Sequence, residues 1–151
     1  MGIDHKKWMR IAIDYAMRAQ QLDEVPVGAV IVSDEQNIVT TAHNTCQKNN
    51  DCTNHAELLA IHDACRTMKT QRLTNCTIYV TLEPCAMCAG AIMHARLHTL
   101  VFGLRDFRSG AAGSVMNVFH ATQTHPGINI IDGVLESESK SLLQNFFKTK
   151  R

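Results

Sequence analysis

The chain has 151 residues, of which 45% are hydrophobic and 19% charged, and these proportions exclude a disordered chain and favour one globular domain over residues 1–151. The formal net charge of +1 excludes the strong overall basic field of many nucleic-acid-binding domains and leaves only local basic clusters at the two ends. No export leader and no apolar run of about 18 residues is present, so we expect a cytoplasmic protein without a membrane span.

The first half of the chain predicts a helix, a hairpin and a second helix. Residues 5–22 carry apolar side chains at helical spacing, with Asp4 as a suitable N-cap. The β-rich runs 27–32 and 38–42 flank a polar turn and predict a hairpin. After a polar loop, Thr53 or Asn54 suits the N-cap of a second helix that runs to about residue 68.

The second half continues the alternation of strands and helices. Pro84 follows a predicted strand and suits the first position of a helix. The predicted elements are a strand at 76–82, a helix at about 85–96, a strand at 99–104, a loop at 105–114, a helical turn at 115–119, a weak strand at 129–131 and a helix at 136–147. This order predicts an α/β fold, with a five-stranded mixed sheet and helices on both faces in three α/β/α layers.

Two short motifs contain candidate metal ligands. The first is His55-Ala56-Glu57, and the second is Pro84-Cys85-Ala86-Met87-Cys88. Cys85 and Cys88 lie three residues apart at a helix start, so both sulfurs face one side, while His55 opens the other helix. The positive ends of the two helix dipoles favour thiolates. One imidazole and two thiolates suit one Zn²⁺ per chain and leave the fourth position of the ion for water.

Glu57 is the candidate catalytic residue, because it lies two residues beyond the histidine and can reach the activated water as a general base and acid. An isolated Cys-x-x-Cys is more often half of a structural zinc site or a redox pair. Here no fourth Cys or His has matching spacing, which favours a catalytic site. Of the remaining cysteines, Cys65 and Cys76 are expected to be core residues. Cys46 and Cys52 lie in a polar loop and have no assigned role.

The joint pattern H-x-E…P-C-x-x-C resembles the signature of zinc-dependent nucleobase deaminases with the cytidine deaminase-like fold. Within that group, nearly the whole chain is similar to the tRNA-specific adenosine deaminase family. The similar segments are residues 25–32, Asn44, 55–57, 81–96, 101–106 and 109–114. One departure is Asp51-Cys52-Thr53-Asn54, where the family usually has Asp-Pro-Thr-Ala, and this changes the loop before the histidine rather than the chemistry.

This resemblance implies zinc-dependent hydrolytic deamination of adenosine to inosine at the wobble position of a tRNA anticodon, by a homodimer that binds the anticodon stem-loop. It implies zinc ligation by His55, Cys85 and Cys88, with Glu57 as proton shuttle. The residues implied to contact RNA are Asn44 at the flipped base, Val27 and Ala56 in the base pocket, Asp106 near the flanking nucleotides, and Phe146 or Phe147 with the basic tail at the anticodon loop. Core packing is the alternative for at least one of the two phenylalanines.

Two other functions stay open at this point. A deaminase of a free base or nucleoside, such as guanine or cytosine, would share the zinc site but would not account for the 109–114 loop and the basic C-terminal segment. A non-catalytic zinc-binding or RNA-binding module would share the zinc ligands but would not require the Glu57 carboxylate.

Overall fold

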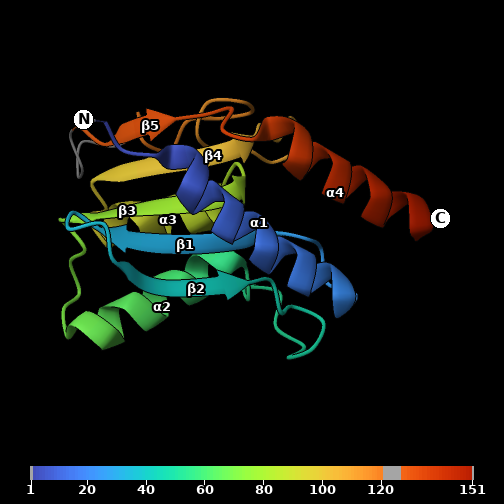
Figure 1. The fold of residues 1–151 in the computed structure, drawn as a ribbon, viewed down its shortest axis with the longest axis horizontal. Coiled ribbons are helices and arrows are strands. Elements are labelled where there is room, and N and C mark those ends of the chain that lie inside the picture. Colours follow the sequence, from blue (N-terminus) through green and yellow to red (C-terminus); the bar gives the residue numbers. More distant parts are fainter. Residues whose placement is uncertain (1, 121–126, 151) are drawn as a thin grey trace.

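The computed structural model describes residues 2–120 and 127–150, which form one five-stranded sheet with two helices on each face (Figure 1). The strands are β1 (Gly28–Ser33), β2 (Ile38–His43), β3 (Cys76–Leu82), β4 (Thr99–Leu104) and β5 (Asn129–Ile131). The helices are α1 (His5–Gln21), α2 (Ala56–Met68), α3 (Ala86–His94) and α4 (Glu136–Thr149).

The sheet has the order β2-β1-β3-β4-β5 and is mixed, as the sequence predicts. Strand β1 pairs antiparallel with both β2 and β3, whereas β3, β4 and β5 run parallel to one another. Because parallel strands end at the same edge of a sheet, the segments that follow β3 and β4 emerge side by side. The loop after β3 therefore lies next to the 105–114 loop.

Alternating side chains of the sheet build a separate core on each face. On one face, Trp8 and Met9 of α1 pack against Val30 and Tyr79, and α4 covers the same face beside α1 (Figure 1). On the other face, α2 and α3 pack against the neighbouring strand positions, such as Ile78. These two cores confirm the predicted α/β/α layering. Within the described ranges, no helix combines the length and the apolar character that crossing a bilayer requires.

Three local predictions are wrong. The N-cap of α2 is His55, not Thr53 or Asn54, and the N-cap of α3 is Cys85, so Pro84 precedes the helix instead of occupying its first turn. Both caps have the extended backbone that is usual for an N-cap, but neither side chain makes a capping hydrogen bond. Residues 115–119 form turns and contribute Asn117 to an isolated bridge with Ala112, and they form no helix because loop hydrogen bonds use their amides.

Gly28 allows α1 to lie directly on β1. A Cβ at this position would clash with the carbonyl oxygen of Ala12 and come within 2.6 Å of the amide nitrogen of Ala16. Both obstacles are helix backbone, so Gly28→Ala is expected to destabilise the fold by about 3 kcal/mol, or about 6–12 °C in Tm. Thermal unfolding measures the effect, with Gly2→Ala as the control, since open space surrounds Gly2. An unchanged Tm for Gly28→Ala would contradict this account of the contact.

Candidate metal centre and substrate pocket

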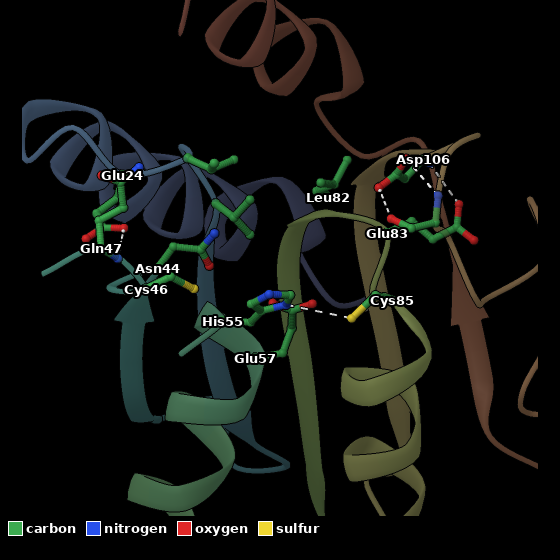
Figure 2. A pocket seen from close by; sticks show the side chains of 13 residues that line it. Glu24, Asn44, Cys46, Gln47, His55, Glu57, Leu82, Glu83, Cys85 and Asp106 are labelled. Carbon is green, nitrogen blue, oxygen red and sulfur yellow. Dashed lines mark hydrogen bonds between the residues drawn. The ribbon is translucent and has the colours of Figure 1, made fainter. Parts of the chain in front are cut away.

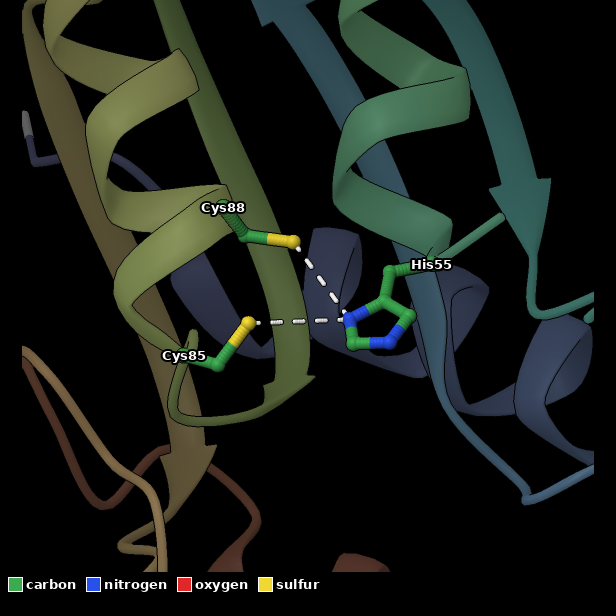
Figure 3. Close-up of side chains that lie close together, drawn as sticks. All are labelled: His55, Cys85 and Cys88. Atoms are coloured by element: carbon green, nitrogen blue, oxygen red, sulfur yellow. Dashed lines mark hydrogen bonds between the residues drawn. The ribbon is translucent and has the colours of Figure 1, made fainter. Parts of the chain in front are cut away.

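The N-termini of α2 and α3 converge at the ends of the strands and bring three ligand atoms together (Figure 3). The Nδ1 atom of His55 lies 3.7 Å from Sγ of Cys85 and 3.6 Å from Sγ of Cys88. All three atoms lie within 4.8 Å of one another. The structure thus brings together the three residues that the two motifs predict as ligands.

This group has the dimensions of a tetrahedral zinc site. Zn–N and Zn–S bonds of about 2.1 and 2.3 Å at tetrahedral angles separate nitrogen and sulfur by about 3.6 Å. Among residues 2–120 and 127–150, no other group of three His, Cys, Asp or Glu side chains gathers closely enough to hold a metal. With three protein ligands, the site has the composition of a catalytic centre rather than of a closed structural one.

The two cysteines differ in their proton affinity because they share a hydrogen bond. The pKa of Cys85 is lowered to about 4, first by a hydrogen bond with the Cys88 thiol and then by one with His55. The same Cys85–Cys88 hydrogen bond, together with burial, raises the pKa of Cys88. One of the two sulfurs therefore carries the negative charge that a metal ligand requires, and a bound dication would ionise the other.

Glu57 lies beside this group and is 4% exposed. Burial raises the pKa of its carboxyl group to about 7. The carboxyl group interacts with Cys88 and lines the pocket next to His55 (Figure 2). A carboxyl group with a pKa near neutrality can both accept and release a proton under physiological conditions, as a general acid-base must.

His55 and Cys85 of the metal-ligating group line a pocket of about 270 Å³ (Figure 2). Of the residues implied to contact RNA, Val27, Asn44 and Asp106 line this pocket. Ala56 is fully buried and is not among the residues that line the pocket. Its backbone amide donates a 2.8 Å hydrogen bond to Oδ1 of Asn44, and this bond orients the Asn44 side chain so that Nδ2 remains to donate to a ligand.

A second groove adjoins the pocket and shares Val25, Leu82, Asp106 and Ser109 with it. Phe147, which is 46% exposed, lines this groove, and Phe107 at its rim is 75% exposed. Phe146 packs in the core at 5% exposure, so one of the two C-terminal phenylalanines is a core residue. In the basic tail, Lys150 pairs with Asp23 at 2.7 Å, and Arg151 lies outside the described residues.

Sequence reasoning missed two buried carboxyl groups that line the pocket, Glu24 and Glu83, which are 1% and 2% exposed. Glu24 accepts hydrogen bonds from the amides of Gln47 and Lys48, at 3.0 and 2.8 Å. Glu83 accepts hydrogen bonds from the 106–114 loop. The signal available in the sequence was an acidic residue one or two positions before a proline, in Glu24-Val25-Pro26 and Leu82-Glu83-Pro84.

Comparisons with known proteins agree with this geometry. A family model described as MafB19-like deaminase matches residues 3–151. The chain is 42% identical to the tRNA-specific adenosine deaminase of Haemophilus influenzae over 146 residues, which are 97% of this chain and 84% of that protein.

Two solved structures are similar over most of the chain. One comes from work on A-to-I editing by tRNA:A34 deaminases at the wobble position, with a TM-score of 0.84, 39% identity, and coverage of 91% of this chain and 99% of that one. A guanine deaminase from Bacillus subtilis has a TM-score of 0.67 and 30% identity, covering 82% of this chain and 79% of that one.

The mixed sheet, the His/Cys/Cys group and the buried carboxyl group define a deaminase of the cytidine deaminase-like fold, which is a hydrolytic enzyme. The sequence identity to these relatives, and the length that is shared with them, identify the family within this class of deaminases. The chain belongs to the tRNA-specific adenosine deaminase family.

Proposed function

We propose that this protein deaminates adenosine to inosine at the wobble position of a tRNA anticodon, with one Zn²⁺ held by His55, Cys85 and Cys88. The observation that carries the proposal is the buried Glu57 carboxyl group beside the three converging ligand atoms, in a chain 42% identical to a tRNA-specific adenosine deaminase. When bound, zinc supplies Lewis-acid activation of water at neutral pH. The whole chain, residues 1–151, then acts as one deaminase domain.

Glu57 moves the protons of the reaction. Its carboxylate accepts a proton from the attacking water and delivers it to the ring nitrogen next to the amino-bearing carbon. The carboxylate next takes a second proton, from the hydroxyl group now bonded to that carbon, and gives it to the amino group. The carbon–nitrogen bond then breaks, ammonia departs and the carbonyl group of inosine remains. Burial excludes bulk water from this transfer, and the pKa of about 7 allows one residue to perform both steps.

The pocket suits a single unpaired base. A volume of about 270 Å³ lies at the lower end of small-molecule sites, so the pocket can receive one base while the rest of the RNA stays outside. Asn44 would donate from Nδ2 to the base, Val27 would pack on it, and Ala56 would orient Asn44 through its backbone amide. Anticodon loops present unpaired bases, so extruding one of them costs little.

The neighbouring groove would receive the rest of the anticodon loop. Asp106 lies between the pocket and the groove, and Phe147 lines the groove, which places both beside the flanking nucleotides in this proposal. We further propose a homodimer in the cytoplasm. Exposed apolar side chains support a self-association surface, among them Met87 on α3 with Val115 and Met116 in the segment between β4 and β5.

A substrate comparison tests the proposal. The zinc-loaded protein is incubated with an anticodon stem-loop carrying adenosine at the wobble position, and separately with free guanine, free cytosine and adenosine. Ammonia release is expected only with the stem-loop, and a stem-loop with guanosine at that position is the matched control. Turnover of free bases without turnover of the stem-loop would replace the proposal with the free-base alternative.

A further inference from the structure

Glu83 joins the metal-binding segment to the loop on the opposite side of the pocket. It directly follows β3 and directly precedes Pro84 and Cys85 in the chain. Its backbone amide donates a 2.8 Å hydrogen bond to the carbonyl of Leu104 at the end of β4. The residue is 2% exposed, and Figure 2 shows its side chain directed toward Asp106. A charged side chain buried to this extent requires compensating hydrogen bonds.

Among the described residues, every hydrogen-bond partner of the Glu83 carboxyl group comes from the 106–114 loop. Oε1 accepts from the amide of Asp106 at 3.0 Å and from the hydroxyl of Ser114. Oε2 accepts from the amides of Ala112 and Ser114, at 2.9 and 3.1 Å. Donors at the beginning and the end of the loop thus meet at one carboxyl group, and the loop is wrapped around it.

Gly110 shows how closely the loop encloses this carboxyl group. A Cβ at Gly110 would lie 2.5 Å from Cδ of Glu83. The neighbouring amide of Ala111 donates to the carbonyl of Pro84 at 2.8 Å, which binds the same loop to the metal-binding segment a second time. The path of the loop therefore depends on Glu83 and on the Pro84 carbonyl.

Asp106 is the pocket residue that this arrangement positions. Its amide is held by Glu83, and its carboxyl group is occupied by the amide of Arg108 at 2.9 Å and the hydroxyl of Ser109 at 3.0 Å. Asp106 and Ser109 both line the pocket and the adjoining groove. A change at Glu83 would therefore affect substrate binding by displacing Asp106.

We propose that Glu83 is a positioning residue that sets recognition of the RNA around the target base by holding Asp106 and the 106–114 loop against the metal-binding segment. This inference rests on the proposed tRNA function. Glu83→Gln replaces one acceptor oxygen with an NH₂ group that faces backbone N–H donors, so the loop loses its anchor while side-chain volume is kept. The expected loss is about 10- to 100-fold in kcat/KM for the stem-loop, mainly through KM, with zinc content unchanged.

A double-mutant cycle distinguishes positioning from general stabilisation. In an Asp106→Ala background, Glu83→Gln is expected to cost less than about threefold, because both changes act through the same loop. Glu24→Gln is the matched control: Glu24 is equally buried and holds the other loop, so its cost should be the same in both backgrounds. Ser114→Ala, which removes the hydroxyl group that donates to Glu83 and accepts from Arg105, supplies the same cycle if Glu83→Gln does not fold.

Two results would overturn the inference. One is an equal cost of the Glu83 or Ser114 change in the wild-type and Asp106→Ala backgrounds. The other is a loss of zinc and kcat without a rise in KM. Absence of wild-type turnover on the stem-loop is a different outcome, since it rejects the proposed function before any variant is compared.

Discussion

Glu57→Gln is expected to lower kcat on the anticodon stem-loop by about 10²–10⁴-fold, the contribution that a positioned general acid-base makes. Glutamine fills the same buried space, but it neither accepts a proton from water nor returns one to the leaving amine. Glu57 belongs to the first turn of α2, whereas the metal is assigned to His55, Cys85 and Cys88. Zinc content should therefore stay at one per chain, and KM should change little.

Single-turnover kinetics and elemental analysis of the same preparation measure both parts of this prediction. Glu138→Gln is the control, because Glu138 also lies in the first turn of a helix but is exposed on α4. Wild-type kcat in Glu57→Gln would exclude Glu57 as the proton shuttle. Loss of zinc together with activity would instead indicate that its carboxyl group supports the metal site.

Removal of the metal is expected to abolish turnover and to lower the stability of the fold. A ligand present at 100 times its dissociation constant stabilises the native state by about 2.7 kcal/mol, or about 5–10 °C in Tm for a chain of this size. Dialysis against a chelator should produce both losses, and added Zn²⁺ should restore both. Activity that persists in metal-free protein would exclude the proposed chemistry.

Cysteine variants test which individual side chains bind the zinc. Cys88→Ser is expected to weaken zinc affinity by more than about 100-fold, since even loss of an outer hydrogen-bond partner of a metal ligand costs 10- to 100-fold. Cys52→Ser is the control, because Cys52 is exposed in the loop before α2. Competition with a chromophoric chelator measures the affinity. Equal affinities of the two variants would contradict the assignment of Cys88.

Most of the elements could be predicted because each depends on neighbouring residues. The β-rich runs at 76–82 and 99–104 coincide with β3 and β4, and 129–131 with β5, since alternation and β-propensity are local properties. The errors lie at element ends. His55 and Cys85 are N-caps although neither is a typical capping residue, and neither makes a side-chain capping bond. Instead, both side chains converge with Cys88 in the His/Cys/Cys group.

The grouping of three potential ligands could also be predicted from the chain, since they lie with one acid in two short motifs that suit one reaction class. Only the folded chain decided how the pocket around them is built. The parallel pairing of β3 and β4 brings Glu83 to Asp106, and the loop path brings Glu24 to the amides of Gln47 and Lys48. Such contacts join residues about 20 positions apart through the shape of the whole sheet, and no local pattern encodes which loop amides will surround a buried carboxyl group.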